Sequence, residues 1–230
     1  MNAILVFVYN YEGYYLYVIK FIKEVIIMEV YALGHSNYPF DKLIEILKKY
    51  NIDCVVDVRE IPYSKYNVQY NKEVFQYNLK KLGYTYIYMA DEFGAKRKTR
   101  ESYNEEGYAD FKKVIHEDSF KRGIERLKVG CNKGYKIVLL SAMQEPIRCS
   151  RAILVGRQLV KEGFDVKYIM HEGDLKTQSD LEEQLLDKYF NCRNQLTIDG
   201  LLGNGLSREE MIEKGYELAN REIGYRMEKL

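Results

Sequence analysis

The stretch LLSAMQEPIRCSR, residues 139–151, decides how the surrounding chain folds. The apolar run of residues 137–140 predicts a buried strand that ends at Ser141. After an interruption by proline, the next helix begins with two guanidiniums and a thiol, those of Arg148, Arg151 and Cys149. Helix N-termini attract anions because their free N–H groups and dipole favour negative charge. Three interpretations follow: a catalytic thiol, an anion pocket or a structural turn.

The same succession of strand and helix recurs from residue 28 onward. Apolar runs that predict strands lie at 30–33, 54–58, 84–89, 136–140 and 166–170. Stretches that predict helices lie at 43–49, with Asn37 as a candidate cap, and at 72–81, 108–115, 119–128 and 151–161. Strands that alternate with helices favour a parallel sheet covered on both faces. We therefore predict an α/β fold with a mostly parallel, Rossmann-like sheet of about five strands.

This pattern divides the chain into an N-terminal extension (1–27), an α/β domain (28–192) and a helical C-terminal tail packed on that domain (193–230). In the tail, Ser207 is the predicted cap of a helix, with Glu210 as its capping-box partner. The extension is apolar and rich in tyrosine. It is an added hairpin or helix, a membrane-surface segment, or a stretch before a true start at Met28. We favour the third interpretation, which N-terminal sequencing of the natively expressed protein would test.

Composition excludes several classes of protein. The 35 basic and 34 acidic side chains nearly cancel, so no global field draws this chain to DNA or a membrane. Four scattered cysteines without a CxxC pair argue against a cysteine zinc site and favour a reducing cytoplasm. Charges interrupt the apolar stretches, so we expect no integral membrane association. The common phosphate-loop, zinc-protease and serine-hydrolase motifs are missing, and we assign no cofactor, metal or oligomeric state.

Polar residues follow the predicted strands, at the edge where open α/β sheets bind ligands. The first such strand is followed by His35 and Ser36, and the second ends with Asp57 and Arg59. His35 is a candidate general base, with Asp57 or Glu92 as its partner in proton transfer. The alternative is a histidine that only fixes the turn. Arg59 is a candidate clamp for phosphate or carboxylate, and the alternative is a buried ion pair with Asp57 that orders the loop.

The cluster after the fourth strand favours an anion pocket over a nucleophilic thiol. A phosphatase loop requires arginine six positions after Cys149, and Val155 lies there. We therefore predict Cys149 as a packed neighbour of the pocket. Arg151, together with Arg148 and Ser141, is the predicted ligand contact, because a guanidinium binds phosphate bidentately.

One basic stretch follows the third predicted strand and contains Lys96, Arg97 and Lys98. Tyrosines surround it in the sequence, and basic groups combined with aromatic rings bind single-stranded nucleic acid through charge and stacking. The alternative is a solvated loop. An anionic small molecule or nucleic acid is therefore the expected partner.

Several segments together resemble one known family. These segments are YALGHSN (31–37), VVDVREIPYS (55–64), YNKEVF (70–75), LGYTYIYMADEFGAKRK (82–98) and EPIRCSRA (145–152). They are similar to the domain of unknown function 488 family in its full-length form. The resemblance implies an α/β fold with a charged crevice and does not supply an established reaction.

This chain departs from the pattern that the resemblance implies. Members of that family commonly end the fourth strand with Cys, a small residue and Glu, and later read Cys-His-Arg. The corresponding residues here are Ser141, Met143 and Ser150 in place of the Cys, Glu and His. Two hypotheses remain: an enzyme acting on a phosphorylated or other anionic substrate, with a nucleotide or nucleic acid favoured, or a non-catalytic module that binds nucleic acid or nucleotide.

Overall fold

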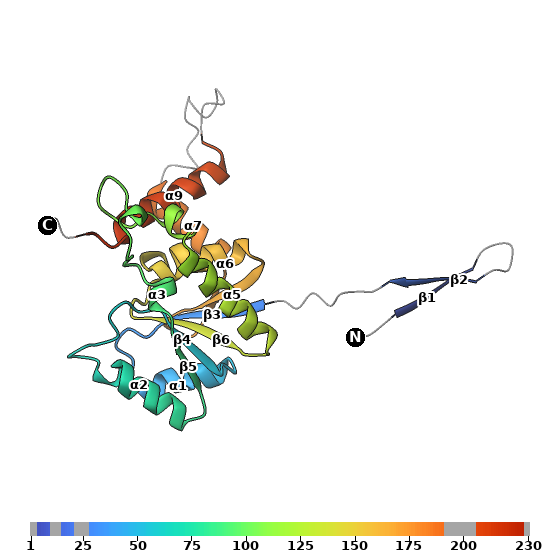
Figure 1. Cartoon of the computed structure of the whole chain (residues 1–230), viewed down its shortest axis with the longest axis horizontal. Coiled ribbons are helices and arrows are strands. Elements are labelled where there is room, and N and C mark those ends of the chain that lie inside the picture. Colours follow the sequence, from blue (N-terminus) through green and yellow to red (C-terminus); the bar gives the residue numbers. More distant parts are fainter. Residues whose placement is uncertain (1–3, 10–14, 21–27, 191–205, 228–230) are drawn as a thin grey trace.

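The apolar runs of the sequence form a six-stranded sheet (Figure 1). The computed structural model describes residues 4–9, 15–20, 28–190 and 206–227. The strands are β3 (Met28–Gly34), β4 (Cys54–Asp57), β5 (Thr85–Tyr88), β6 (Ile137–Ser141), β7 (Phe164–Ile169) and β8 (Leu175–Lys176). Their order is β5-β4-β6-β3-β7-β8, and β3 to β7 run parallel. The predicted α/β fold is confirmed.

The sheet has one more strand than the five apolar runs predicted. After β7 the chain turns at Gly173, which has a φ of 82°. It then pairs β8 antiparallel to β7. A strand of two residues is too short to produce a periodic pattern, so its pairing depends on the turn.

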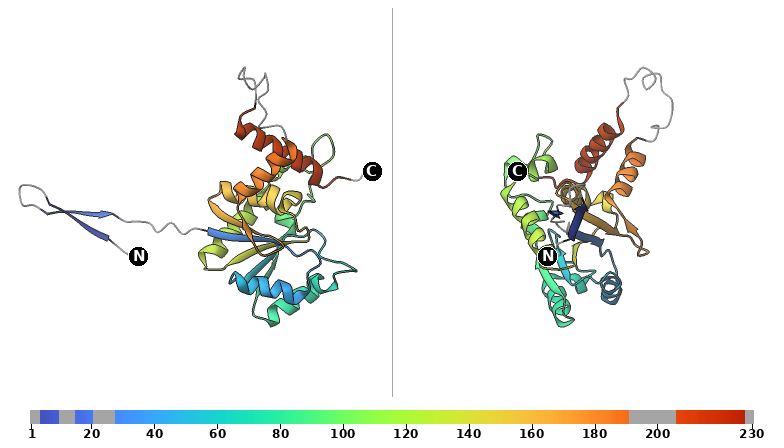
Figure 2. Two further views of the ribbon diagram at one scale, coloured as in Figure 1. Left: turned by 180° about the vertical axis from the view of Figure 1, so that it is seen from behind. Right: turned by 90° about the vertical axis from the view of Figure 1, so that its right-hand side faces the viewer.

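Helices cover both faces of the sheet because side chains alternate along each strand. On β3, Tyr31 and Leu33 belong to one buried cluster, with residues of α1 (Phe40–Lys49) and α2 (Lys72–Lys81). Val30 and Ala32 belong to the opposite cluster. The helices that contribute to that second cluster include α5 (Asp118–Asn132), α6 (Arg157–Lys161), α7 (Gln178–Tyr189) and α9 (Arg208–Ile223). Figure 2 shows the same two layers from behind and from the side.

Several local predictions need correction. The helix predicted over 108–115 is only α4 (Phe111–Val114), because Tyr108 forms an isolated bridge with Arg226. Residues 91–93, for which no helix is predicted, lie in α3 (Ala90–Phe93). The N-cap of α1 is Pro39 and not Asn37. Three short 3₁₀ turns, η1 (Val68–Tyr70), η2 (Arg100–Ser102) and η3 (Pro146–Arg148), lie in the loops.

The helix predicted over 151–161 begins as a π-helix, η4 (Arg151–Gly156), and continues as α6. All six residues of η4 are buried. Gly156 allows close packing, since a Cβ there would lie 1.9 Å from the Tyr168 hydroxyl. That hydroxyl donates to Gln178, which in turn donates to Tyr216 of α9. This buried hydrogen-bond chain joins β7, α7 and the C-terminal helix.

Helix α9 begins with the predicted capping box, in which Ser207 and Glu210 bond each other's backbone. Asn220 near its end accepts from the Phe111 N–H at 2.9 Å and donates to the Ala109 carbonyl at 2.8 Å. The preceding residues 194–205 of the tail, and Cys192, lie outside the described residues. Division of the chain into three parts stays a prediction.

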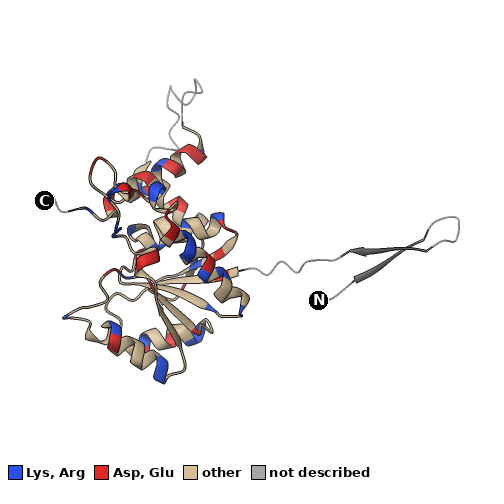
Figure 3. Cartoon of the chain, in the orientation of Figure 1, with Lys and Arg blue, Asp and Glu red and all other residues tan. Residues whose placement is uncertain are grey.

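Strands β1 (Ile4–Tyr9) and β2 (Tyr15–Lys20) form a separate antiparallel pair. They lie within the N-terminal extension, and its role stays a prediction. Along the described part of the chain, no helix is both long enough and apolar enough to span a bilayer. Acidic and basic side chains alternate over the helices of the domain (Figure 3), as the balanced composition led us to expect.

Candidate functional site

The guanidinium of Arg59 is held from two sides at the carboxyl edge of the sheet. Asp57, the last residue of β4, accepts from Arg59 Nε at 2.8 Å and from Nη2 at 2.6 Å. His35, directly after β3, accepts from Nη1 through its Nε2 atom at 3.2 Å. Phe75 of α2 packs against the guanidinium, with 5.6 Å between Cζ and the ring centroid. The structure thus brings three of the predicted site residues together and fixes the orientation of Arg59.

Asp57 is fully buried and uses both carboxylate oxygens. Its Oδ1 accepts from the Arg59 backbone N–H at 3.1 Å as well as from Nε. Its Oδ2 accepts from the Tyr86 hydroxyl at 2.8 Å as well as from Nη2. Burial and the neighbouring carboxylate raise the pKa of Tyr86, which keeps that hydroxyl a donor. Because each oxygen already accepts two hydrogen bonds, this geometry suits Asp57 to orienting Arg59 better than to accepting a substrate proton.

The hydrogen bonds of His35 define its tautomer. Nδ1 lies 2.8 Å from the Ser36 carbonyl oxygen, which can only accept, so Nδ1 carries the proton. Nε2 is then free to accept from Arg59. Burial, followed by the charge of Arg59, lowers the pKa of His35 to about 4. The ring also stacks on Tyr70, with 3.8 Å between centroids. His35 is therefore a neutral acceptor near pH 7.

Donors remain unused beside this cluster. A guanidinium has five N–H groups, and Asp57 and His35 take three of those of Arg59. The other two have no partner within the described residues. The Tyr70 hydroxyl is also buried without a partner, and burial raises its pKa. Arg59 is 8% exposed, so a ligand can reach its free N–H groups only in a nearly desolvated position.

The turn after β3 and the loop after β6 are joined through their backbones. The N–H groups of His35 and Ser36 donate to the carbonyls of Ser141 and Ala142 at 2.9 and 3.0 Å. Ser36 has a φ of 47° and is half-buried, and its hydroxyl contacts only Asn37 at 3.5 Å. A Cβ on Gly34 would lie 1.9 Å from the Met143 carbonyl oxygen, so the contact requires glycine. This join holds His35 in register with the second cluster.

Ser141, Cys149 and Arg151 form that second cluster. The Ser141 hydroxyl accepts from Arg151 Nη1 at 2.5 Å and from the Cys149 thiol at 3.4 Å. Arg151 also donates to the carbonyls of Met143 and Gln144. Cys149 is half-buried. The structure therefore brings three predicted ligand-binding residues together, but their hydrogen bonds join one another and the loop after β6.

The environment of Arg151 differs from the one expected for a residue that contacts a ligand. The side chain is 0% exposed, because the whole of η4 is buried, and its terminal N–H groups bind the loop after β6. Its Nε has no partner. Within the described residues no carboxylate pairs with it. Arg148, the other predicted guanidinium, is exposed and lies 3.6 Å from Glu145. Arg151 thus contributes a buried, uncompensated charge and no accessible face.

Comparison with known proteins gives one match. The family model described as Domain of unknown function DUF488 matches residues 39–158. The chain belongs to the DUF488 family. Searches of curated proteins and of solved structures found no match. The matched DUF488 region contains Asp57, Arg59, Ser141 and the cluster around Arg151, and it begins after His35. The resemblance seen in the sequence is confirmed at the level of the family.

Glu92, the other predicted partner of His35, has a different partner in this DUF488 chain. It is part of α3, and its carboxylate pairs with Arg126 of α5. It also lines a cavity between α5 and the sheet. Proton transfer between Glu92 and His35 stays a prediction, because within the described residues the carboxylate pairs with Arg126 and the imidazole bonds Arg59.

The basic loop at 96–98 has internal partners that its sequence did not predict. Arg97 is buried and donates to the Glu117 carboxylate and to the Gly94 carbonyl. Lys98 pairs with Asp91 at 2.9 Å. Lys96 is exposed, with its Nζ 5.4 Å from the ring centroid of Tyr225. The loop therefore presents less free positive charge than its sequence indicates, because partners distant in sequence neutralise it.

Sequence reasoning missed Glu60, which directly follows Arg59. Its Oε2 is buried without a partner, and burial raises the pKa of this carboxyl group. A Cβ on Gly94 would lie 2.3 Å from that oxygen, so glycine makes room for it. The only sequence signal was its position next to Arg59. Glu60 is the best candidate for a proton donor at this edge.

The loop that follows Glu60 carries exposed apolar side chains. It projects from the carboxyl edge between β4 and α2 (Figure 1). Tyr66 is 94% exposed and Tyr63 is 54% exposed, and Ile61 and Val68 are exposed beside them. Tyr70, at the end of the same loop, stacks on His35. The loop thus carries exposed rings, and it ends at the ring that stacks beside Arg59's partner His35.

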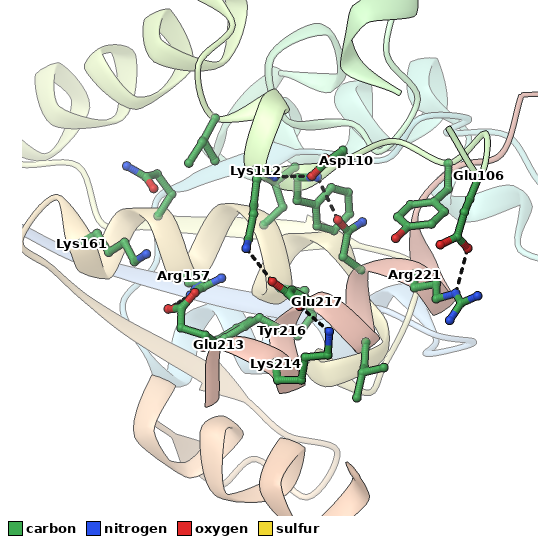
Figure 4. A pocket seen from close by; sticks show the side chains of 18 residues that line it. Glu106, Asp110, Lys112, Arg157, Lys161, Glu213, Lys214, Tyr216, Glu217 and Arg221 are labelled. Atoms are coloured by element: carbon green, nitrogen blue, oxygen red, sulfur yellow. Dashed lines mark hydrogen bonds and ion pairs between the residues drawn. The ribbon is translucent and has the colours of Figure 1, made fainter. Parts of the chain in front are cut away.

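A separate, charged cavity contains none of the predicted site residues (Figure 4). It has a volume of about 350 Å³, and residues of α4, α6 and α9 line it. Its charges are mostly paired: Glu217 binds Lys112 and Lys214, and Arg157 pairs with Glu213. These pairs hold α9 against the domain, so we assign this cavity a structural role.

Side chains that could ligate a metal, those of His35, Asp91 and His171, each have another partner. His35 bonds Arg59, Asp91 pairs with Lys98, and His171 contacts the Tyr38 hydroxyl at 2.7 Å. Across the residues that the structure describes, no three His, Cys, Asp or Glu side chains converge on one point.

Proposed function

We propose that this protein binds the phosphate of an anionic ligand at the carboxyl edge of its sheet, with Arg59 as the direct contact. The observation that carries the proposal is the orientation of Arg59 by Asp57 and His35, with two N–H groups left unused. A guanidinium fixed in this way binds phosphate or carboxylate oxygens with little loss of conformational freedom.

The buried charges support the same ligand. Arg59 and Arg151 contribute two positive charges, and Asp57 contributes one negative charge, which leaves one positive charge in excess. A buried charge without a counter-ion is costly. An anion bound at Arg59 lowers that cost, and the desolvated position strengthens the attraction.

We favour a nucleotide or single-stranded nucleic acid as the ligand. Bases stack on exposed aromatic rings while the backbone meets a positive group. Tyr63 and Tyr66 are such rings, on the loop that leads from Arg59 to Tyr70. Lys65 lies exposed between them. These tyrosines, and not the basic loop at 96–98, are the main support for a nucleotide or nucleic-acid ligand, because Arg97 of that loop is buried.

Binding without chemistry is the primary function. His35 and Asp57 act as positioning residues, because their acceptor atoms are occupied by Arg59. Glu60 favours a second candidate, an enzyme, because a carboxyl group with a raised pKa and a free oxygen can donate a proton. In that case Glu60→Gln abolishes turnover and retains binding.

The test uses the full chain and a short fluorescein-labelled oligothymidylate, followed by anisotropy. Arg59→Lys keeps the charge but loses the planar fork, and we expect affinity to fall about tenfold or more. Tyr66→Ala removes one stacking surface, and we expect a fall of about tenfold. Arg208→Ala, an exposed arginine of α9 paired with Glu183, is the matched control and leaves affinity unchanged.

Inorganic phosphate provides a second measurement that needs no variant. Phosphate at Arg59 changes the environment of His35, so its imidazole nitrogen resonances shift in a saturable way. Equal affinity of wild type, Arg59→Lys and Tyr66→Ala for the oligonucleotide, together with unshifted His35 resonances in phosphate, would rule out the proposed site.

A further inference from the structure

A second, apolar cavity lies between the sheet and α5, and the proposed anion site does not use it. Its volume is about 770 Å³. Its floor consists of sheet residues, Cys54, Val56, Ile87, Met89 and Ile137. Its wall is formed by α5, with Leu127, Val129 and Gly130. Cavities of about 300–1,000 Å³ with mainly apolar walls are typical of small-molecule sites.

The topology explains why the space stays unfilled. α5 packs on β3 and β6 in the middle of the sheet, and β5 is an edge strand. Near Ile137 the helix approaches closely, because a Cβ on Gly130 would lie 2.9 Å from the Ile137 Cδ1 atom. The contacts of α5 with the sheet are mainly with β3 and β6, and residues of β4 and β5 line the cavity. Burial raises the pKa of the Cys54 thiol to about 12, which fits a dry, apolar floor.

Charged side chains surround the mouth of this cavity, and the positive ones are in excess. Lys121, Arg122 and Lys133 line it and form no ion pair within the described chain. Among the acidic residues of the lining, Glu92 pairs with Arg126 and Glu125 pairs with Lys128. Asp118 is the acidic lining residue without such a partner. Over all the lining residues, four basic side chains face three acidic ones, so an anionic group at the mouth meets one net positive charge.

We propose that this cavity binds an amphiphile with an apolar body and a carboxylate head. The apolar body lies on the sheet residues, where its burial removes apolar surface of both partners from water. The carboxylate stays at the mouth beside Arg122 and Lys133, partly hydrated. The site is separate from Arg59, and none of its lining residues belongs to the edge cluster around His35.

The absence of tryptophan from the chain allows a direct test. Val129 lines the mouth and is 51% exposed, so Val129→Trp places a unique fluorophore there with little risk to folding. Val160→Trp, at an exposed position of α6 outside this cavity, is the matched control. We expect decanoate to cause a saturable blue shift of emission in the first full-length variant and none in the second.

The head group is tested in the same Val129→Trp background. Arg122→Glu combined with Lys133→Glu reverses the unpaired charge, and we expect roughly three- to tenfold weaker decanoate binding. Lys48→Glu, a charge reversal on α1 at the opposite face, leaves binding unchanged. Decanol, which is neutral, binds more weakly than decanoate to the protein with its native charges.

Two results would overturn the proposal. One is emission from Val129→Trp that does not change with decanoate below its micelle concentration. The other is an equal response of the Val129→Trp and Val160→Trp proteins, which indicates nonspecific adsorption. Loss of the oligonucleotide site at Arg59 leaves this outcome unaffected, so the two proposals fail independently.

Discussion

The neutral state of His35 predicts how stability depends on pH. The folded protein lowers the pKa of His35 from its usual 6.5 to about 4, through burial and the charge of Arg59. In the unfolded chain the imidazole keeps its usual pKa, so below pH 6.5 the unfolded state binds the extra proton. Stability is therefore fully present above this pH. It is lost as pH falls, and the loss due to His35 is complete near pH 4.

The magnitude follows from the pKa difference. A pH of about 5 is about 1.5 units below the pKa of this histidine in the unfolded chain, and each pH unit corresponds to about 1.36 kcal/mol of free energy. The native histidine stays mostly neutral there. His35 therefore lowers the free energy of unfolding by about 2 kcal/mol between about pH 7 and about pH 5. Carboxyl groups also titrate in this range, so the effect is isolated by comparison with a variant.

His35→Gln is the matched variant, because its side-chain oxygen can accept from Arg59 and does not titrate. Urea denaturation at both pH values gives the free energy of unfolding of each protein. We expect the wild type to lose about 2 kcal/mol more than His35→Gln on acidification. Equal losses, or a wild type that gains stability at the lower pH, would refute a neutral His35 that accepts from Arg59. Nitrogen NMR of the imidazole checks the tautomer independently.

Three further predictions concern packing. Arg151→Met removes the guanidinium donors to the buried Ser141 hydroxyl and to the Met143 and Gln144 carbonyls, and we expect urea denaturation to show a loss of about 2 kcal/mol or more. Gly156→Ala clashes with the Tyr168 hydroxyl and should cost about 1–3 kcal/mol, while addition of Tyr168→Phe recovers part of this. Additive losses in that thermal-unfolding cycle would contradict the contact. Ser207→Ala removes the α9 cap and should cost about 1 kcal/mol, whereas an unchanged melting temperature would show that the cap contributes nothing.

Much of the fold follows from local patterns. Apolar runs of four to six residues became β3, β4, β5, β6 and β7, because the strands of a parallel sheet covered by helices need mostly continuous apolar sequence. Helix α2 begins and ends at the predicted residues, and the capping box at Ser207 is present. Boundaries differed where a tertiary contact intervened, as at Tyr108, which pairs with Arg226 near the far end of the chain.

The candidate site was harder to predict, because the chemistry of a charged group depends on its partners. Arg59, Arg97 and Arg151 have the same side chain, yet their partners differ. Arg59 is held by His35 with two of its N–H groups free within the described residues, Arg97 pairs with Glu117, and Arg151 donates to loop carbonyls. No sequence pattern singles out Glu60, because its pKa is raised by burial beside Gly94 in the folded structure.

The sequence by itself determined a parallel α/β sheet, its capped C-terminal helix and the edge at which polar residues gather. These properties depend on the periodicity of neighbouring residues, which any reader of the chain can measure. Only the tertiary structure decided the strand order, the internal partners of Arg97 and Arg151, and the cavity between α5 and the sheet. Those properties depend on contacts between residues far apart in the chain, such as His35 with Arg59 and Glu92 with Arg126, and no local pattern records them.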